Sequence, residues 1–341
     1  MDTSQLGEFG LINRLSSRLK FRSSKLKIGI GDDCAVYTCA PGKYQIATTD
    51  ALLETVHFDL DTTSPEQLGR KSLAVNISDI AAMGGTPTLA LITIGVPQKL
   101  TVSFLDKFYD GINQVSQKYG VVLAGGDTIA SPNHLFINIT VLGEVDRKRL
   151  FTRSGAKPGD KILVTGNLGD SALGLRLLKS PHHNWAGITQ KMKVVIQKHL
   201  DPTPRMLESK ILSRSGAKIT SMIDISDGLV QDLGHICNNS EVGAILHNKQ
   251  LPISPALKYI CNHNNLDSND FVLAGGEDYE LLFTTSPKDV TKIIRQFRKT
   301  DTPVTVIGEI TSSKGELFLV HESGRRDSLR NTKGYDHFRQ A

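Results

Sequence analysis

Acidic residues recur beside glycines at the ends of predicted strands and helices, and this recurrence constrains the fold more than any other feature of the sequence. The stretch GIGDDCAVY, residues 29–37, places Asp32 and Asp33 side by side after Gly29 and Gly31. Similar segments follow in TTDALLETVHFD, NISDIAAMGG, AGGDTI, IDISDGL and GGEDYELLF. Adjacent carboxylates repel one another unless a cation or water screens them. We therefore expect a fold that gathers these segments around cations.

Length and composition favour a globular protein of two domains. The chain has 341 residues, of which 39% are hydrophobic and 22% are charged, and a chain of this length usually divides into two cores. It has no apolar stretch of 18 residues, so we expect no membrane span. The net charge of +5 comes from scattered Lys and Arg without an aromatic platform, so we expect no nucleic-acid partner.

Cysteine usage and the N-terminal segment indicate a cytoplasmic protein. The four cysteines form no CxxC pair, which argues against a structural zinc site or a disulfide framework. The first 15 residues are acidic early and show no apolar core followed by a cleavage site, so we expect no signal peptide.

Residues 1–145 are predicted to form one α/β unit with the order β-β-α-β-α-β-β. Strands are expected at 44–50, ending in Asp50, at 86–97 and at 134–145, and another at 120–128 runs into a glycine turn. A helix over 65–85 has an apolar face and a polar stripe, and Gly84 and Gly85 end it. A second amphipathic helix carries its apolar residues at positions 104, 108, 112 and 115.

A second unit, residues 146–341, is predicted to start after a charged break. A strand at 161–166 leads into a helix within 167–178, and residues 221–237 read as a strand, an acidic turn and a helix. Further strands are expected at 303–310 and 316–320. A strict β-α repeat is not seen, so we expect mixed sheets rather than a doubly wound parallel sheet.

The acidic segments suggest a site for Mg²⁺ and phosphate. Mg²⁺ takes oxygen ligands and retains waters, so it needs carboxylates spread around a phosphate. Several Mg²⁺ ions would offset both the repulsion among the acids and the charge of a polyphosphate. The candidates from the pattern alone are Asp32, Asp33, Asp50, Asp79, Asp127, Asp224, Asp227, Glu277 and Asp278.

Each candidate also has a structural interpretation. An Asp after glycine often forms a turn, and Asp227 or Ser226 in ISDGL could cap the helix that follows. Asp79 shares a stripe with Ser72 and Asn76, which could be a solvated helix face. Arg153 in FTRSG could clamp a phosphate or lie on the surface. His57 could contact a substrate or fill a strand end.

Standard nucleotide-binding motifs are missing. The sequence contains no GxxxxGK[ST], no GxGxxG and no protein-kinase motif set. The segment TGNLGDSALG resembles a phosphate loop but has no lysine, so we expect a turn into a helix, with a possible anion site at the helix N-terminus.

The motifs taken together resemble those of the thiamine-monophosphate kinases. The resemblance rests on segments found in order along nearly the whole chain. They are GEFGLI, GIGDDCA, TTDALLETVHF, KSLAVNISDIAAMGG, GGDT, TRSGAKPGD, TGNLGDSALGL, IDISDGL, GGEDYEL and KGYDHF. The broader superfamily also holds selenophosphate and aminoimidazole ribonucleotide synthetases, which remain the alternative. A selenophosphate synthetase should carry a reactive cysteine near its N-terminus, whereas the first cysteine here is Cys34.

The resemblance implies a two-domain fold of the aminoimidazole ribonucleotide synthetase type, α/β or α+β in class. It implies a homodimer in which the N-terminal mixed sheets form a shared barrel, with residues 1–145 serving ATP, metal and dimer contacts. It also implies ATP-dependent phosphorylation of thiamine monophosphate to thiamine diphosphate. The acceptor phosphate is already an anion, so direct in-line transfer needs positioning and charge neutralisation more than a strong base.

The resemblance further implies a role for each site residue. The catalytic residues are Asp50 and Asp227. The metal ligands are Asp33, Thr48, Thr49, Asp50, Asp79, Asp127, Asp224 and Asp227. The ATP contacts are Asp33, Thr49, Gly126, Asp127, Arg153 and Ser226. The thiamine side holds His57, Glu277 and Tyr335. Asp32 matches no functional position clearly, and Thr48 stands where serine is common.

Overall fold

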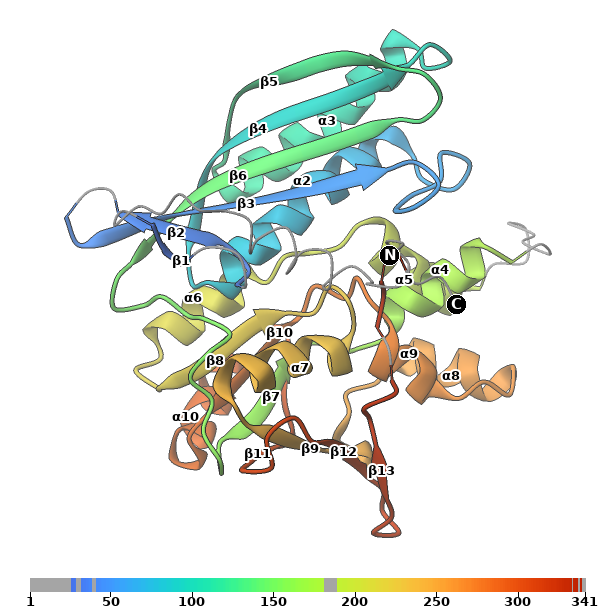
Figure 1. Cartoon of the computed structure of the whole chain (residues 1–341). Helices are drawn as coiled ribbons and strands as arrows, with labels where there is room; N and C mark the ends of the chain where they lie inside the picture. Colours follow the sequence, from blue (N-terminus) through green and yellow to red (C-terminus); the bar gives the residue numbers. More distant parts are fainter. Residues whose placement is uncertain are drawn as a thin grey trace, which may run out of the picture.

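Two mixed sheets with helices packed against them make up the part of the chain that the structure describes (Figure 1). The computed structural model describes residues 26–28, 32–38, 41–180, 189–332, 334–336 and 338. Three parts of the sequence motifs lie outside these residues. They are Gly29 and Gly31 of GIGDDCAVY, the whole of GEFGLI, and part of KGYDHF. The strands of the first sheet are β1 Leu26–Ile28, β2 Ala35–Thr38, β3 Lys43–Leu53, β4 Thr86–Pro97, β5 Val122–Ser131 and β6 Phe136–Asp146. Those of the second are β7 Lys161–Thr165, β8 Ile219–Asp224, β9 Gly243–His247, β10 Leu281–Thr285, β11 Val304–Thr311, β12 Leu317–Val320 and β13 Arg326–Ser328.

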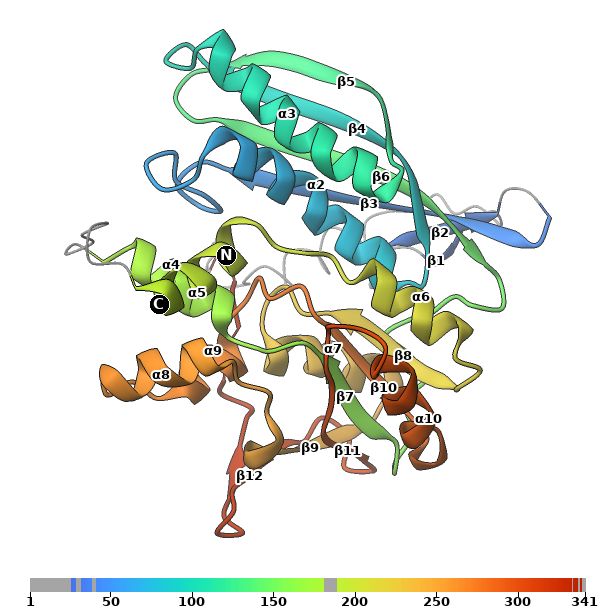
Figure 2. The same ribbon diagram turned by 180° about the vertical axis from the view of Figure 1, so that it is seen from behind.

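The first sheet has the strand order β1-β2-β3-β6-β4-β5, with only β4 and β5 parallel. Helices α2 Pro65–Ala82 and α3 Val102–Tyr119 lie on one face of it (Figures 1 and 2). Apolar side chains of this face and of the two helices form one core. The predicted order of elements is confirmed, with the short β1 in addition. Among the described residues no helix covers the opposite face.

Helix α2 lies between the first sheet and the second half of the chain (Figure 2). Ser64 and Gln67 form a capping box at its start, and Gly84 with φ 72° follows its end. The helix is buried on nearly every side, so the solvated face considered for Asp79 is wrong. The Ser78 hydroxyl donates a hydrogen bond of 2.6 Å to Asp224, which belongs to β8.

Strand β5 corrects the predicted glycine turn. It continues through Gly125 and Gly126, which have φ values of 149° and 155°. A Cβ on Gly126 would lie 1.7 Å from the Ile92 carbonyl oxygen, so the glycine lets β5 approach β4. Strand β3 likewise continues to Leu53 instead of ending at Asp50. Acidic residues therefore lie inside these strands and not only at their ends.

The second sheet has the order β13-β12-β9-β11-β7-β10-β8, and only β9 and β12 are parallel. The strands and helices expected in this half are present, and β9, β10, β13 and most helices were not predicted. Its helices are α4 Asp170–Leu178, α5 Gln190–Leu200, α6 Met206–Arg214, α7 Leu229–Ser240, the 3₁₀ helix η2 Asn248–Gln250, α8 Pro255–His263, α9 Ser268–Ala274 and α10 Pro287–Phe297. Neither sheet closes into a barrel within the described residues. No helix among them has the length and hydropathy that a membrane crossing requires.

The close packing of α2 on α3 depends on glycine and gives a first prediction. A Cβ on Gly111 of α3 would lie 2.1 Å from the Glu66 carbonyl oxygen, whereas a Cβ on Gly234 of α7 meets nothing closer than 3.9 Å. We expect Gly111→Ala to lower the free energy of unfolding by about 1–3 kcal/mol through overpacking. Gly234→Ala, the matched control, should raise it by up to about 1 kcal/mol through helix propensity. Urea denaturation of the two variants checks this, and equal effects would contradict it.

Candidate active site

A cavity of about 680 Å³ lies between the two halves of the chain. Residues of the first half that line it include Asp33, Thr48, Asp50, His57, Phe58, Val75 and Asp79, and residues of the second half include Arg153, Leu175, Leu178, Lys179, His199, Ser226, Asp227, Glu277, Tyr279 and Tyr335. Part of the lining is acidic, around Asp33, Asp50 and Asp79, and we call it the acidic end; another part combines apolar side chains with Glu277 and His199. The fold thus brings most of the predicted site residues to one place.

Arg153 offsets part of the repulsion between the neighbouring carboxylates of Asp32 and Asp33. Its Nη2 lies 2.7 Å from an oxygen of Asp33, and its Nε lies 4.0 Å from Asp32. The Arg153 side chain is 19% exposed, so the interpretation as a surface arginine is wrong. Burial and the charge of Asp33 raise the pKa of Asp32 to about 6. The pair is therefore stabilised in part by a buried guanidinium.

Asp33, Asp79 and Asp224 form a cluster suited to a cation. Each offers one carboxylate oxygen, and these oxygens lie within 4.8 Å of one another. Oδ2 of Asp33 is buried and has no hydrogen-bond partner. Burial, followed by repulsion from neighbouring carboxylates, raises the pKa of Asp79 and of Asp224 well above the usual range. A bound divalent cation would relieve both the repulsion and the unpaired oxygen.

Strand β3 directs alternate side chains to opposite faces of the sheet. The Thr48 hydroxyl donates to the carboxylate of Asp79, and the Asp50 N–H donates to Oδ1 of Asn76 at 3.1 Å. The Thr49 hydroxyl instead lies 3.0 Å from the Thr140 hydroxyl of β6. Thr48 and Asp50 therefore belong to the acidic end, whereas the Thr49 side chain points to the other face.

Burial, with repulsion from Asp227 and Asp33, raises the pKa of Asp50 to about 6. Asp50 is thus another buried carboxylate that a cation would stabilise.

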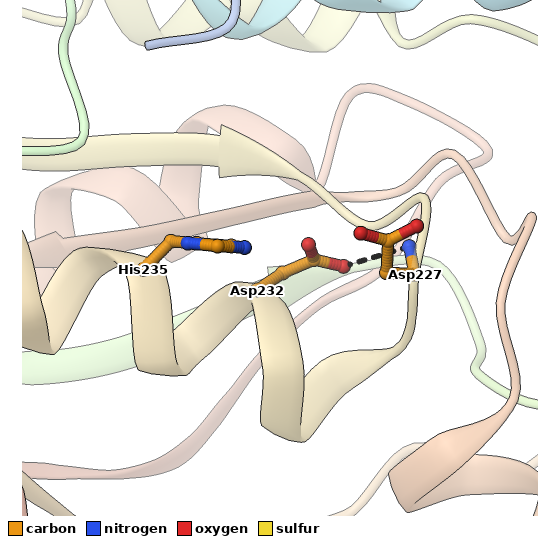
Figure 3. A group of neighbouring side chains, drawn as sticks. All are labelled: Asp227, Asp232 and His235. Carbon is orange, nitrogen blue, oxygen red and sulfur yellow. Dashed lines mark hydrogen bonds between the residues drawn. The ribbon is translucent and has the colours of Figure 1, made fainter. Parts of the chain in front are cut away.

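Among the described residues no side chain makes a capping hydrogen bond at the start of α7, so the cap considered for Asp227 or Ser226 is wrong. Oδ2 of Asp232 accepts hydrogen bonds of 3.1 Å from the N–H groups of Asp227 and Gly228. Figure 3 shows Asp227, Asp232 and His235 in a row along the start of this helix. They offer ligand atoms within 4.8 Å of one another. Asp227 lines the cavity beside Ser226, and its carboxylate accepts a bond from Gln231.

The residues assigned to thiamine line another part of the cavity, which we call the thiamine end. Glu277 pairs with Lys71 at 2.9 Å and with Nδ1 of His199 at 3.1 Å. His57 accepts the Leu53 N–H at Nδ1, 3.0 Å away, and lines the cavity. Tyr335 is 44% exposed, and its N–H donates to the Asp227 carbonyl.

The N-terminus of α4 does not present its N–H groups to a phosphate. Oδ2 of Asp278 accepts the Gly169 N–H at 2.8 Å, and Oδ1 accepts the Ser171 N–H at 3.4 Å. The carboxylate therefore occupies the place that the sequence suggested for an external anion.

Gly126 and Asp127 lie away from the cavity. They belong to the edge strand β5, and Asp127 is exposed. In register, Asp127 pairs with Thr93, which pairs with Asn138, which pairs with Ala51 of β3. Three strand spacings, or about 14 Å, separate this position from the strand that carries Asp50.

Several site residues were not predicted. Lys71, His199 and Asp232 are buried, and each contacts a predicted residue or its backbone. Of these, Lys71 left a signal, because it is a charged residue within a helix that is buried over most of its length. His199 and Asp232 lie in helices with no distinctive motif.

Comparison with known proteins defines the class. The profile described as AIR synthase related protein, N-terminal domain, matches residues 31–145, and the C-terminal profile of the same family matches residues 157–320. The chain therefore belongs to the AIR synthase related family.

Individual relatives narrow the assignment. The thiamine-monophosphate kinase of Bacillus subtilis is 36% identical over 98% of this chain and 100% of its own length. That of Escherichia coli strain K12 is 38% identical over 97% of this chain and 98% of its own. A solved structure described as AaThiL complexed with AMPPCP and TMP has a TM-score of 0.84 at 34% identity and covers 99% of both chains. The chain belongs to the thiamine-monophosphate kinase family.

Proposed function

We propose that this chain transfers the γ-phosphoryl group of ATP to the phosphate of thiamine monophosphate and forms thiamine diphosphate. The observation that carries the proposal is the cavity itself, whose lining combines a group of carboxylates suited to polyphosphate and cations with apolar, aromatic and acidic side chains. The relatives named thiamine-monophosphate kinase, and the related structure that carries AMPPCP with TMP, support the same assignment.

The acidic end fits Mg²⁺, with several ions expected. Asp33, Asp79 and Asp224 would hold it, and the unpaired oxygen of Asp33 provides a ligand position. Asp50 and Asp227 lie in the same cavity and complete the proposed set with Thr48. Mg²⁺, when bound, supplies charge neutralisation at the phosphates.

The chain's own residues position the two anionic reactants. Arg153, beside Asp33, would contact phosphate oxygens, and Ser226 would contact ATP. Glu277 offers a negative charge to the thiazolium ring, and Tyr335 offers an aromatic face. The acceptor oxygen is an anion, so no strong base is needed, and we propose one in-line displacement.

A second copy of the chain would complete the site with Gly126 and Asp127. Strand β5 is a sheet edge with exposed apolar residues, including Val122 at 62% and Ile129 at 50%. Pairing of such an edge with another chain buries both its apolar surface and its unpaired backbone groups. We propose a homodimer formed through the domain of residues 1–145, with residues 146–341 as the second domain. The buried thiols of Cys34, Cys237 and Cys261 suit the cytoplasm.

A product assay tests the function. The protein with ATP and Mg²⁺ should convert thiamine monophosphate to thiamine diphosphate, detected by chromatography. With γ-phosphate made chiral by oxygen isotopes, the configuration at phosphorus should invert, because one displacement inverts it. No diphosphate, together with ATP use on aminoimidazole precursors, would contradict the assignment, and retention of configuration would contradict direct transfer.

A further inference from the structure

A lysine buried in the middle of α2 contributes to the thiamine end of the cavity without lining it. The Lys71 residue is 1% exposed, and its Nζ lies 2.9 Å from Oε1 of Glu277. Burying an ammonium group costs several kcal/mol unless a close counter-charge offsets the lost hydration. A hydrophobic residue would pack here at lower cost, so the pair calls for a role beyond stability.

The Glu277 carboxylate is held from two further directions. Its Oε2 lies 3.1 Å from Nδ1 of His199, which also lies 3.1 Å from the Ser171 hydroxyl. Its own N–H donates to the Ser226 carbonyl at 2.7 Å, and its backbone has a positive φ of 64°. A non-glycine residue in this conformation is maintained by its surroundings. Backbone and side chain therefore fix one orientation of a carboxylate that lines the cavity.

The charges around this carboxylate are arranged to keep it ionised. Burial alone would raise the pKa of Glu277, but the charge of Lys71 and the hydrogen bond from His199 bring it well below its usual range. Burial and the charge of Lys71 lower the pKa of His199, although Glu277 opposes them. The polar groups that face His199 are Lys71 from α2, Ser171 from α4, Lys179 directly after α4, and Glu277. Lys71 is thus the cation of the group, and His199 is neutral.

We propose that Lys71 is a positioning residue for the phosphate acceptor, which holds the Glu277 carboxylate charged and fixed so that it meets the cationic ring of the acceptor. The inference rests on the proposed function, because it assigns the thiamine end of that same cavity. Lys71 acts through Glu277 and contacts no acidic residue of the metal cluster in the ion pairs of the described residues. Its loss should therefore affect acceptor binding and spare ATP.

Replacement of Lys71 by methionine tests this with a close match in shape. By calorimetry, Lys71→Met should weaken the binding of thiamine monophosphate about tenfold or more. The KM for ATP should stay within about twofold of the wild-type value, because the lost contact lies outside the acidic end. Lys198→Met removes the same charge from an exposed position next to His199 and should leave both values unchanged.

The pH dependence distinguishes positioning from a general loss of packing. Without Lys71, the pKa of His199 rises because Glu277 still attracts its proton and the repelling ammonium is gone. His199 then becomes the counter-charge as the pH falls from 8 to 6. Acceptor binding by Lys71→Met, taken relative to the wild type at each pH, should therefore recover toward pH 6. The double variant Lys71→Met/Glu277→Gln removes both charges of the ion pair. It should bind the acceptor weakly at every pH and show no recovery toward pH 6.

The outcomes separate the inference from the function on which it rests. A wild-type protein that neither binds nor phosphorylates thiamine monophosphate overturns both. A wild-type protein that does both, with acceptor binding by Lys71→Met equal to that by Lys198→Met, overturns the inference alone. An equal loss of acceptor affinity and ATP affinity in Lys71→Met also overturns the inference alone. If Lys71→Met does not fold, tight acceptor binding by the folded double variant overturns the inference as well.

Discussion

Formation of thiamine diphosphate should fall by about 10³-fold or more in kcat when Asp50 is replaced by asparagine, because the proposed function makes the Asp50 charge act on the transferred phosphoryl group. Asp50 lines the cavity, and burial with repulsion from Asp227 raises its pKa to about 6. A carboxylate in this setting is ready to neutralise a bound cation. Asparagine keeps the shape and removes the charge. Steady-state rates at saturating ATP and Mg²⁺ measure the effect.

The same substitution should leave the metal-free protein as stable at pH 7.5, or make it more stable. The folded pKa of Asp50 lies above its unfolded value, so the folded state binds a proton more tightly and loses stability as the pH rises through about 6. Asparagine has no proton to release, so Asp50→Asn does not lose this stability as the pH rises. The Asp50 N–H keeps its bond to Asn76, since that bond comes from the backbone.

The control is Asp106→Asn on the exposed face of α3, which should change neither rate nor stability. Near-normal turnover in folded Asp50→Asn, or a loss of activity that simply follows a loss of folded protein, would contradict the role of Asp50.

Local sequence predicted the elements well where period and capping agreed. The helix over 65–85 was predicted from its apolar face and from Gly84 and Gly85 at its end, and α2 spans Pro65–Ala82. The turn predicted at Gly125 and Gly126 was wrong because glycine also serves where two backbones approach closely. That approach depends on β4, more than 25 residues away, and is not visible in a local pattern.

The acidic residues of the site were predictable as a class, but their partners were not. Arg153 lies 120 positions from Asp33, and Lys71 reaches Glu277 from the other half of the chain. The solvated face considered for α2 failed for the same reason, because Ser78 meets Asp224 across 146 positions. Such pairs form only when the two halves pack together, so they cannot be predicted from the spacing of residues along the chain.

Asp127, like Gly126, is a predicted site residue that does not line the cavity of its own chain, and a second copy of the chain gives the sharpest test. Strand β5 lies at one edge of the sheet, and β4 and β6 separate it from the interior strand β3. If residues 1–145 form the dimer, Asp127 of one subunit acts at the site that contains Asp50 of the other. Asp50→Asn and Asp127→Asn homodimers should each lose most of their activity, since every site lacks a carboxylate.

Mixed dimers show whether Asp127 contributes to the site of its own chain or to the site of the partner subunit. A dimer of one Asp50→Asn subunit and one Asp127→Asn subunit, isolated with two affinity tags, has one site with both aspartates intact if Asp127 acts across the interface. Its activity should be about half that of the wild-type dimer. If Asp127 acts within its own chain, both sites are damaged and the mixed dimer is as inactive as either parent.

The reciprocal dimer supplies the matched control. One subunit carries both substitutions and its partner is wild type, so the number of altered residues is the same as before. Action across the interface damages both sites and abolishes activity, whereas action within one chain leaves one site intact and about half the activity. The two dimers must therefore give opposite results. Half activity in the reciprocal dimer would overturn the shared site, and a monomer in sedimentation that is fully active would overturn the dimer itself.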